Sequence, residues 1–590
     1  MKKVLFIFLF IFLIVFSVGC KTTNVDDNNS NNSNNNNNNN QNEEKDLNTY
    51  SHTKLLLLDK EKKYIELLGC EATQLSDDVS VKKIVGEDVV DASIDDLYIG
   101  MDNLYVQIYD NKKIDKILID KDPIFPRIRV AIRKTISNIS DINTLYHDSI
   151  TLHIPSNTTI ETFDKTNSFI VDDNTTVTFN VKDNYIYGYV GKRLIKSSKR
   201  LIINETDSEV IFQSISRGVG TPSYEGNIEL SVVNGKILVI NDVLMENYLE
   251  KVVPSEMPSS WNMEALKSQA VAARTYAYKE IYKNNFASLG YVVDDSESSQ
   301  VYNNQSKQET SSRAVLETKG LTMFCENEPI VAYYFSTCSG LLGAGNEVWI
   351  ENKVTDKIPY LLGGNISSRE VDTTDENDVL NYFKDLSVDS PSANSSNFRW
   401  KISMNKKQLQ NTLNVNIALM APNYKSSYLI LQDGNFVEGD IPSDIGEIQD
   451  VFVSQRGESG VVVSIQIVAS NVTFRIYNQY NIRFTIRPKD CGSLVEKYNC
   501  KGNSTAYTDK TNNPSILPSG YFALEWEGDI LHFYGGGNGH GVGMCQYSAN
   551  DYAKKGKTFD EILNVFYKNI ILKNTSRKYI PMDAFEKYFK

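Results

Sequence analysis

Histidine and cysteine are scarce in this chain, which limits the metal and thiol chemistry that it can support. Its 590 residues include five histidines and seven cysteines, and no two cysteines form a Cys-x-x-Cys pair, the spacing of many zinc and redox sites. Cys338 offers a thiol, but no histidine lies near it in sequence, so a Cys-His enzyme is a weak alternative. Cys491 and Cys500 are close enough in sequence to form a disulfide after export.

Positive charge is also in deficit. The 61 Lys and Arg residues are outnumbered by 74 Asp and Glu residues, so the net charge is -13 and the pI is near 5.1. This balance argues against nucleic-acid binding, which requires a basic surface. Any binding to an anionic polymer should therefore depend on local contacts.

Hydrophobic runs long enough to cross a membrane comfortably are not found at the N-terminus. Lys2 and Lys3 precede an apolar run from Val4 to Val18, which is short for a membrane span and typical of a signal peptide. Ser17-Val18-Gly19-Cys20 looks like a bacterial lipobox, with Ser17 where Leu is commoner. We expect residues 1–20 to be a lipoprotein signal peptide, Cys20 to carry lipid, and the protein to be exported and held at the membrane by that anchor. The alternative is an uncleaved N-terminal anchor.

Residues 21–46 form an Asn-rich segment with too few apolar side chains to build a core. We predict a disordered tether with an r.m.s. reach of roughly 30 Å on flexible-chain scaling. Biased nucleotide composition is an alternative explanation that needs no function.

The rest of the chain has the pattern of an α+β protein with much sheet. Short apolar runs alternate with Asp, Asn and Lys turns over residues 47–124, which predicts a small β-rich domain. Strand patterns continue to about residue 240 and return at 450–487, while helix patterns cluster at 262–284 and after 543. We treat residues 125–590 as one strand-rich region with a few helices and a polar insertion near 365–397.

One carboxylate stands in an unusual setting. Glu256 lies between Pro254 and Pro258, beside Met257 and shortly before Trp261. Apolar neighbours disfavour the ionised form of a carboxyl and raise its pKa towards the range of a general acid. Glu256 is therefore our candidate catalytic acid. The alternative is an ordinary loop carboxylate that has the same neighbours but no catalytic role.

The helix expected after Glu256 carries a buried stripe that includes Leu266, Ala270 and Ala273. Arg274 lies on or beside this stripe, and a buried guanidinium needs an anionic partner. That partner is either a protein carboxylate such as Glu256 or a bound ligand, and a purely structural ion pair is the plain alternative.

A glycine-rich segment near the C-terminus, residues 535–543, has six glycines in nine positions around His540. Such glycines permit positive φ or close backbone approach, and they place His540 at the start of a short helix that Gly556 would end. The segment lacks the Lys-Ser/Thr pair of a phosphate loop. Thr558 and Glu561 fit a capping box that opens a last helix.

Together these segments resemble the SpoIID/LytB family, whose sporulation members are peptidoglycan lytic transglycosylases. The matching stretches, in chain order, are residues 247–249, 253–276, 333–340, 347–349, 359–361, 456 with 459–460, and 535–556. Two long motifs and several short ones in the family's order are too many for a chance match.

The resemblance implies roles for individual residues. Glu256 matches the catalytic acid/base, Arg274 the arginine of the active-site helix, and Tyr360 a tyrosine of the cleft, while His540 and Gln546 belong to the glycine-rich signature. Some members carry a zinc site of Cys and His near the segment that here surrounds Ser299. Its ligands are missing, so we predict no zinc and no other cofactor.

A single carboxylate suits this chemistry. Hydrolytic glycosidases use two, whereas in a lytic transglycosylase the muramic acid's own C6 hydroxyl attacks C1 and leaves a 1,6-anhydromuramic end. The expected partners are peptidoglycan glycan strands, the membrane through lipid, and a cell-wall amidase or other hydrolase. The rival interpretation is a non-catalytic module that binds glycan and activates such an amidase, as LytB-type relatives do.

Overall fold

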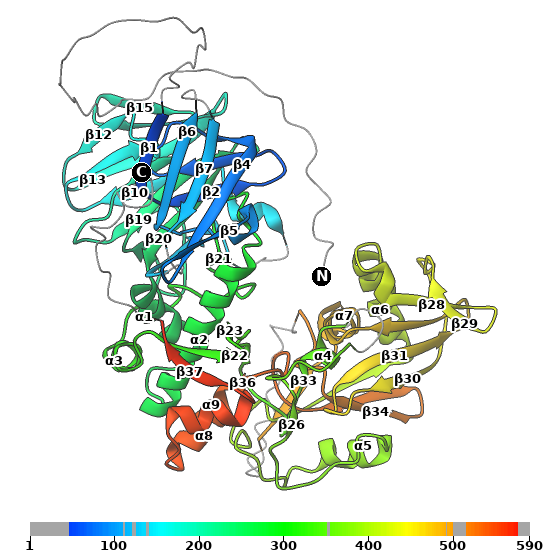
Figure 1. The fold of residues 1–590 in the computed structure, drawn as a ribbon. Coiled ribbons are helices and arrows are strands. Elements are labelled where there is room, and N and C mark those ends of the chain that lie inside the picture. The colour runs from blue at the N-terminus through cyan, green and yellow to red at the C-terminus, as the bar shows by residue number, and fades with distance from the viewer. Residues whose placement is uncertain are drawn as a thin grey trace, which may run out of the picture. The chain divides into compact units, whose positions relative to one another are not determined.

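The computed structural model describes residues 47–109, 113–120, 125–136, 141–350, 355–490, 492–499 and 515–575 (Figure 1). Strands outnumber helices and build several sheets, so the α+β class expected from the sequence is confirmed. The predicted signal peptide, tether, lipidated Cys20 and Cys491–Cys500 disulfide lie outside the described residues. No helix within the described ranges is long and apolar enough to span a membrane.

The chain forms two compact units. Unit 1 contains the described residues up to Leu244 together with Ile281–Ser299, and unit 2 contains Met245–Glu280 and the residues from Gln300 onward. A boundary near residue 124 and an insertion at 365–397 stay predictions.

In the described residues, unit 1 consists of three sheets. The first has the order β1-β6-β7-β4-β3-β2 with β5 beside β4, and its strands are β1 (Leu47–Thr53), β2 (Leu55–Asp59), β3 (Tyr64–Leu67), β4 (Gln74–Val85), β5 (Asp88–Ala92), β6 (Leu104–Tyr109) and β7 (Lys113–Ile119). The second has the order β15-β14-β13-β10-β17-β18, with β10 (Ser149–Ile154), β13 (Thr175–Lys182), β14 (Tyr185–Val190), β15 (Arg193–Ser197), β17 (Val210–Phe212) and β18 (Ser223–Tyr224). The third has the order β12-β11-β16-β19-β20-β8-β21 with β9 beside β20, with β8 (Arg127–Ala131), β9 (Tyr146–His147), β11 (Thr158–Thr162), β12 (Ser168–Val171), β16 (Leu201–Ile203), β19 (Asn227–Val233), β20 (Lys236–Leu244) and β21 (Val293–Asp294).

A buried ion network joins the first and third sheets of unit 1. Arg129 binds both oxygens of Glu229, each at 2.6 Å, and Arg200 pairs with the same Glu229 at 3.2 Å and with Glu66 at 2.7 Å. These side chains are almost fully buried. Because an unpaired charge there would be very costly, the network fixes β3, β8, β19 and the start of β16, which Arg200 directly precedes, relative to one another.

Nine helices belong to the described part of unit 2. They are α1 (Met245–Glu256), α2 (Met263–Lys283, which runs on into unit 1), α3 (Glu309–Glu317), α4 (Gly345–Val348), α5 (Glu376–Lys384), α6 (Lys406–Met420), α7 (Gln479–Thr485), α8 (Gln546–Lys554) and α9 (Phe559–Phe566).

The strands of unit 2 form two substantial sheets and three small ones in the described residues. The sheet β33-β27-β35-β34 contains β27 (Arg399–Asn405), β33 (Val495–Tyr498), β34 (Phe522–Glu527) and β35 (Ile530–Gly535), and the sheet β29-β28-β32-β31-β30 contains β28 (Tyr428–Gln432), β29 (Asn435–Glu438), β30 (Ile448–Arg456), β31 (Val462–Ala469) and β32 (Thr473–Tyr477). The small sheets pair β23 (Glu328–Pro329) with β22 (Leu321–Cys325) and β37 (Ile571–Asn574), β24 (Tyr334–Phe335) with β36 (Met544–Cys545), and β25 (Leu341–Leu342) with β26 (Gly364–Asn365). One core beneath α6 serves both larger sheets.

The helix boundaries near the two motifs agree with the sequence patterns. Asn262 caps α2 through a hydrogen bond from the Glu264 amide at 3.0 Å, and the capping box of Thr558 and Glu561 opens α9. Gly556 has φ +91° just after α8, as expected of a residue that ends a helix. Helix α1 was not expected, because Pro254 lies inside it and proline usually excludes a helix interior.

Candidate functional site

Glu256 is the last residue of α1, and its carboxylate is held rather than free. The Val301 amide donates a hydrogen bond to Glu256 Oε1 at 2.7 Å. Pro254 and Met257 beside it are buried, while Glu256 itself is half-buried. An amide that donates to one carboxyl oxygen orients the group, which is a requirement for an acid that must meet one substrate atom.

Gln546 from the glycine-rich motif reaches the same point. Its Nε2 donates to the backbone carbonyl of Glu256 at 3.0 Å and to Gln269 Oε1 at 3.3 Å, although Gln546 is 290 positions from Glu256. The structure therefore brings two of the predicted site residues together and connects α1, α2 and α8 at the candidate acid.

A polar network lies behind Glu256. Gln300 Nε2 donates to Tyr334 Oη at 3.0 Å, and Tyr248 Oη donates to Gln300 Oε1 at 3.1 Å. Burial, and then the negative charge of Glu256, raise the pKa of Tyr334 well above its ordinary value. Tyr334 therefore keeps its proton. Neither Gln300 nor Tyr334 was among the predicted site residues, although Tyr334 lies in the matched stretch 333–340 and Gln300 is next to Ser299.

Two aromatic rings belong to residues that are close in sequence to Glu256 and Gln546. Trp261 and Tyr547 pack edge to face with their ring centroids 4.8 Å apart. The Asn262 amide donates to Asn550 Oδ1 at 3.1 Å, which ties the loop after α1 to α8. Both rings are half-buried, so part of each ring surface remains available to a ligand.

Arg274 has a different partner from the one considered in the sequence analysis. It forms a bidentate ion pair with Glu246 of α1, at 3.0 and 2.6 Å, and donates to the carbonyls of Val315 and Leu321. Its side chain has no exposed surface. The partner is therefore a protein carboxylate, but Glu246 and not Glu256. A direct contact between Arg274 and glycan stays a prediction.

His540 is held as a neutral imidazole. Nδ1 accepts the Val542 amide hydrogen at 3.1 Å, so Nε2 carries the proton and donates to the Tyr334 carbonyl at 3.0 Å. Burial lowers the pKa of His540 to about 4. Because both nitrogens are occupied by backbone, His540 joins the glycine-rich loop to β24 and is poorly placed for proton transfer.

The rings around His540 lie on the other face of β24 from Glu256. Successive strand side chains point to opposite faces: Tyr333 and Phe335 contact His540 at 5.9 and 5.4 Å between centroids, whereas Tyr334 bonds Gln300. Trp349 packs on Tyr333 at 4.2 Å. Tyr360 is on this side too, since its Oη accepts the Val331 amide at 3.3 Å and its charge, after burial and Glu280, helps to raise the pKa of Tyr333 to about 12.

The glycines of the C-terminal motif allow close packing within the protein. Gly543 has φ +77°, and an added Cβ would collide with the Tyr333 carbonyl. At Gly541, φ is +84° and a Cβ would meet the Tyr521 ring. Both positions require glycine because the backbone conformation and the space exclude a side chain.

The Cys338 thiol is buried against other polar side chains. Cys545 Sγ accepts the Cys338 amide at 3.1 Å, and Cys338 Sγ lies 3.1 Å from Ser392 Oγ and 3.4 Å from Ser548 Oγ. Burial acts to raise its pKa, but hydrogen bonds from Cys545, Ser392 and Ser548 lower the pKa of Cys338 to about 6. With 2% exposure this sulfur is inaccessible to a polymer, which argues against the Cys-nucleophile alternative.

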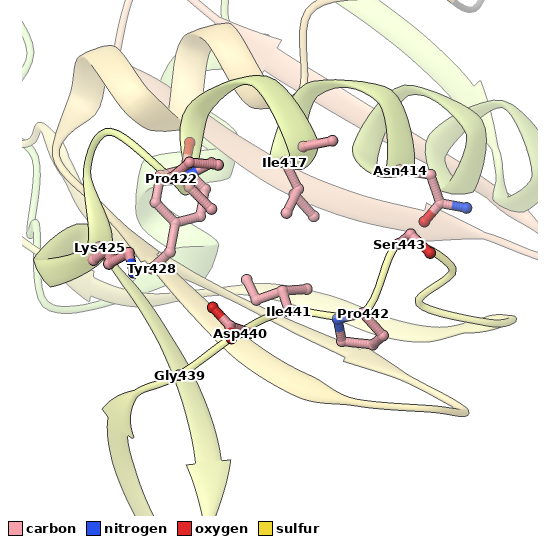
Figure 2. Close-up of a pocket in the computed structure, with 12 residues that line it drawn as sticks. Asn414, Ile417, Pro422, Lys425, Tyr428, Gly439, Asp440, Ile441, Pro442 and Ser443 are labelled. Atoms are coloured by element: carbon pink, nitrogen blue, oxygen red, sulfur yellow. The ribbon is translucent and has the colours of Figure 1, made fainter.

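A separate cavity of about 350 Å³ opens beside α6 (Figure 2). Its lining includes apolar side chains such as Ile417 and Ile441 and the charged residues Lys425 and Asp440. None of the predicted site residues lines it; those that do are Asn414, Ile417, Ala418, Ala421, Pro422, Lys425, Tyr428, Gly439, Asp440, Ile441, Pro442 and Ser443. In the described part of the chain, no group of three or more His, Cys, Asp or Glu side chains is arranged to hold a metal ion.

Comparison with known proteins gives a family match for the part of the chain that contains Glu256. Residues 233–324, which contain α1, the Glu256 loop and α2, match the family model SpoIID, Stage II sporulation protein. An uncharacterized protein of Brachyspira hyodysenteriae is 27% identical over 60% of this chain and 73% of its own length. Stage II sporulation protein D of Bacillus subtilis is 26% identical over 56% of this chain and 74% of its own, and the Amidase enhancer of Bacillus subtilis is 25% identical over 55% and 40%. These matches confirm the resemblance to the SpoIID family that the motifs predicted.

Proposed function

We propose that this protein cleaves peptidoglycan glycan strands as a lytic transglycosylase, with Glu256 as the acid and base. The observation that carries the proposal is the held carboxylate: Val301 fixes Glu256 Oε1, and Gln546 fixes the backbone of the same residue. A peptidoglycan-related role follows from the family, and the cleavage chemistry is the proposed step.

The reaction needs one titrating group. Because Oε1 accepts an amide hydrogen, the proposal assigns the proton of Glu256 to Oε2. That proton passes to the glycosidic oxygen as its bond to C1 breaks, and the carboxylate then accepts the proton of the C6 hydroxyl as the C6 oxygen bonds to C1. Tyr334, kept neutral beside Glu256, can donate a hydrogen bond to the carboxylate.

Substitution of Glu256 tests this assignment. Glu256→Gln should keep the fold and glycan binding yet abolish release of anhydromuropeptides, measured by mass spectrometry of digested sacculi, because an amide cannot donate and recover the proton. Glu250→Gln is the matched control, since Glu250 lies on the same helix and pairs with Lys307 at 2.7 Å. Native cleavage by Glu256→Gln would refute the proposal.

A second candidate function is activation of a cell-wall amidase by a glycan-binding module. The relative named Amidase enhancer favours it. It predicts that the protein releases no glycan fragments alone but accelerates a purified amidase, and that Glu256→Gln leaves this acceleration intact. The held carboxylate is better explained by the catalytic proposal, because activation requires no acid.

We further propose that the protein acts outside the cytoplasmic membrane, anchored by lipid on Cys20. The support is the signal-like sequence and lipobox alone. Two acyl chains of a diacylglyceryl group hold a protein stably, whereas one does not. Cys20→Ala should leave the precursor uncleaved or release the protein from the membrane fraction. A mature N-terminus elsewhere, without lipid, would contradict the anchor.

A further inference from the structure

Three tyrosines line one face of β14. Tyr185, Tyr187 and Tyr189 alternate with the buried Ile186 and Gly188, so their rings share the outward face of the second sheet in unit 1. Tyr185 is 39% exposed and Tyr189 57% exposed. Scattered exposed apolar residues are normal on protein surfaces, but three aromatic rings in a row, roughly 7 Å apart at the usual strand rise, form a continuous platform.

Hydrogen-bonding and cationic side chains border this platform through the strand register. Lys182 of β13 is opposite Tyr185, and Asn180 is opposite Tyr187. On the other side Lys196 of β15 is opposite Tyr187, and its Nζ lies 4.4 Å from the centre of the Tyr185 ring. Tyr185 and Tyr187 thus have polar neighbours within reach of a ligand lying on them, whereas Tyr189 is opposite the exposed Leu194.

The strand beneath the rings is fixed. Ile186 is fully buried, and a Cβ at Gly188 would press on Phe179 and Val177 at 3.0 Å. Asp183 and Asn184 both have positive φ, 52° and 61°, as in the tight two-residue turns that set hairpin register. The rings are therefore presented in a preformed arrangement, which lowers the entropic cost of binding.

The charge of this face differs from that of the whole protein. Lys182 and Lys196 are exposed beside the tyrosines, and Lys192 is exposed in the turn between β14 and β15, against one exposed acid, Asp183, in the turn between β13 and β14, while the chain as a whole carries -13. A local cationic surface that carries flat rings complements a polymer whose sugars have apolar C–H faces and whose substituents are carboxylates.

We propose that the outward face of β13–β15, defined by Tyr185, Tyr187, Tyr189, Lys182 and Lys196, binds an extended anionic glycan strand of peptidoglycan, as a second site in unit 1. Sugar rings stack on the tyrosines, and Lys182 and Lys196 meet the carboxylates of the strand. The choice of polymer rests on the proposed function, but the site contains none of the residues assigned to cleavage.

The test uses the full-length protein carrying Glu256→Gln, so that the polymer is not cut during sedimentation. Binding to purified insoluble peptidoglycan, stripped of covalently attached wall polymers, is compared with and without Tyr185→Ala and Tyr189→Ala together. We expect at least tenfold weaker binding. Lys196→Glu should weaken binding and make it less sensitive to salt. The control is Val89→Ala with Val90→Ala, two residues that are 42% and 41% exposed on β5 of the same unit and should have no effect.

Unchanged binding by both the tyrosine and the lysine variants would overturn the proposal. Binding that is seen with untreated peptidoglycan but disappears once the attached wall polymers are removed would also overturn it. So would variants that lose binding to a protein partner but keep their binding to peptidoglycan. In the Glu256-intact protein, the tyrosine variant should retain cleavage of short soluble glycans. Sedimentation and cleavage therefore report on the two proposals separately. Sedimentation that the tyrosine variant does not weaken counts against this site, and a lack of cleavage by the Glu256-intact protein counts against the proposed activity.

Discussion

Breaking the ion pair between Arg274 and Glu246 tests whether Arg274 stabilises the fold around the site or contacts glycan. Glu246→Gln removes the negative charge and leaves Arg274 in place. Arg274 has no exposed surface and Glu246 is 24% exposed, so the substitution leaves a buried guanidinium with neutral acceptors alone: the carbonyls of Val315 and Leu321 and the amide oxygen introduced at position 246. Breaking a buried pair by removing one partner costs about 3–5 kcal/mol, and the partial exposure of Glu246 places our expectation near 3 kcal/mol.

The assay is denaturant unfolding of both single variants and of the double variant. If Arg274 is structural, Glu246→Gln and Arg274→Gln each lower the free energy of unfolding by a similar amount, and the double variant loses much less than their sum. Glycan KM, measured where the variants are folded, should not change, while kcat falls because α1 also carries Glu256. A raised KM for Arg274→Gln alone, with little loss of stability, would refute this reasoning and support direct glycan contact.

Three further outcomes follow from the site. Gly543→Ala should destabilise unit 2 severely, seen as a fall in Tm, whereas Gly434→Ala, with φ +81° and open space around it, should cost only about 1 kcal/mol; equal effects would contradict the packing argument. Because the pKa of His540 is about 4 in the fold against an ordinary 6.5, unfolding binds a proton between these values, so stability should fall by up to about 3 kcal/mol as pH drops from 6.5 to 4; His540→Gln should remove that part of the slope, and an unchanged slope would exclude His540. Gln546→Ala should lower kcat roughly tenfold with KM unchanged, since it loosens the backbone of the acid; a change in KM instead would make Gln546 a substrate ligand.

The parts of the site that lie in local motifs could be predicted from the sequence. Glu256 could be singled out as a candidate because its apolar neighbours are adjacent in the chain, and the caps at Asn262 and Thr558 depend on residues two or three positions away. The meeting of Gln546 with Glu256 could be expected only through family resemblance, because no local signal connects positions so far apart.

The partners of buried charges could not be predicted. The spacing on α2 indicated that Arg274 is buried but not which carboxylate pairs with it. Its partner Glu246 lies in α1, and that helix was not expected because it contains Pro254. Charged residues in strands, such as Arg129 and Glu229, follow a pattern typical of solvent-exposed positions. Their burial depends on how sheets pack, which is a tertiary property.

The product of the reaction tests the central claim most directly. Purified peptidoglycan is digested by the protein in water labelled with heavy oxygen, and the new muramic ends are examined by mass spectrometry. If Glu256 transfers protons while the C6 hydroxyl attacks C1, every new end is an anhydro form that contains no solvent oxygen, and Glu256→Gln yields none. New reducing ends that carry heavy oxygen would show hydrolysis, and the absence of any new end would show that the protein does not cut glycan; either result would contradict the claim.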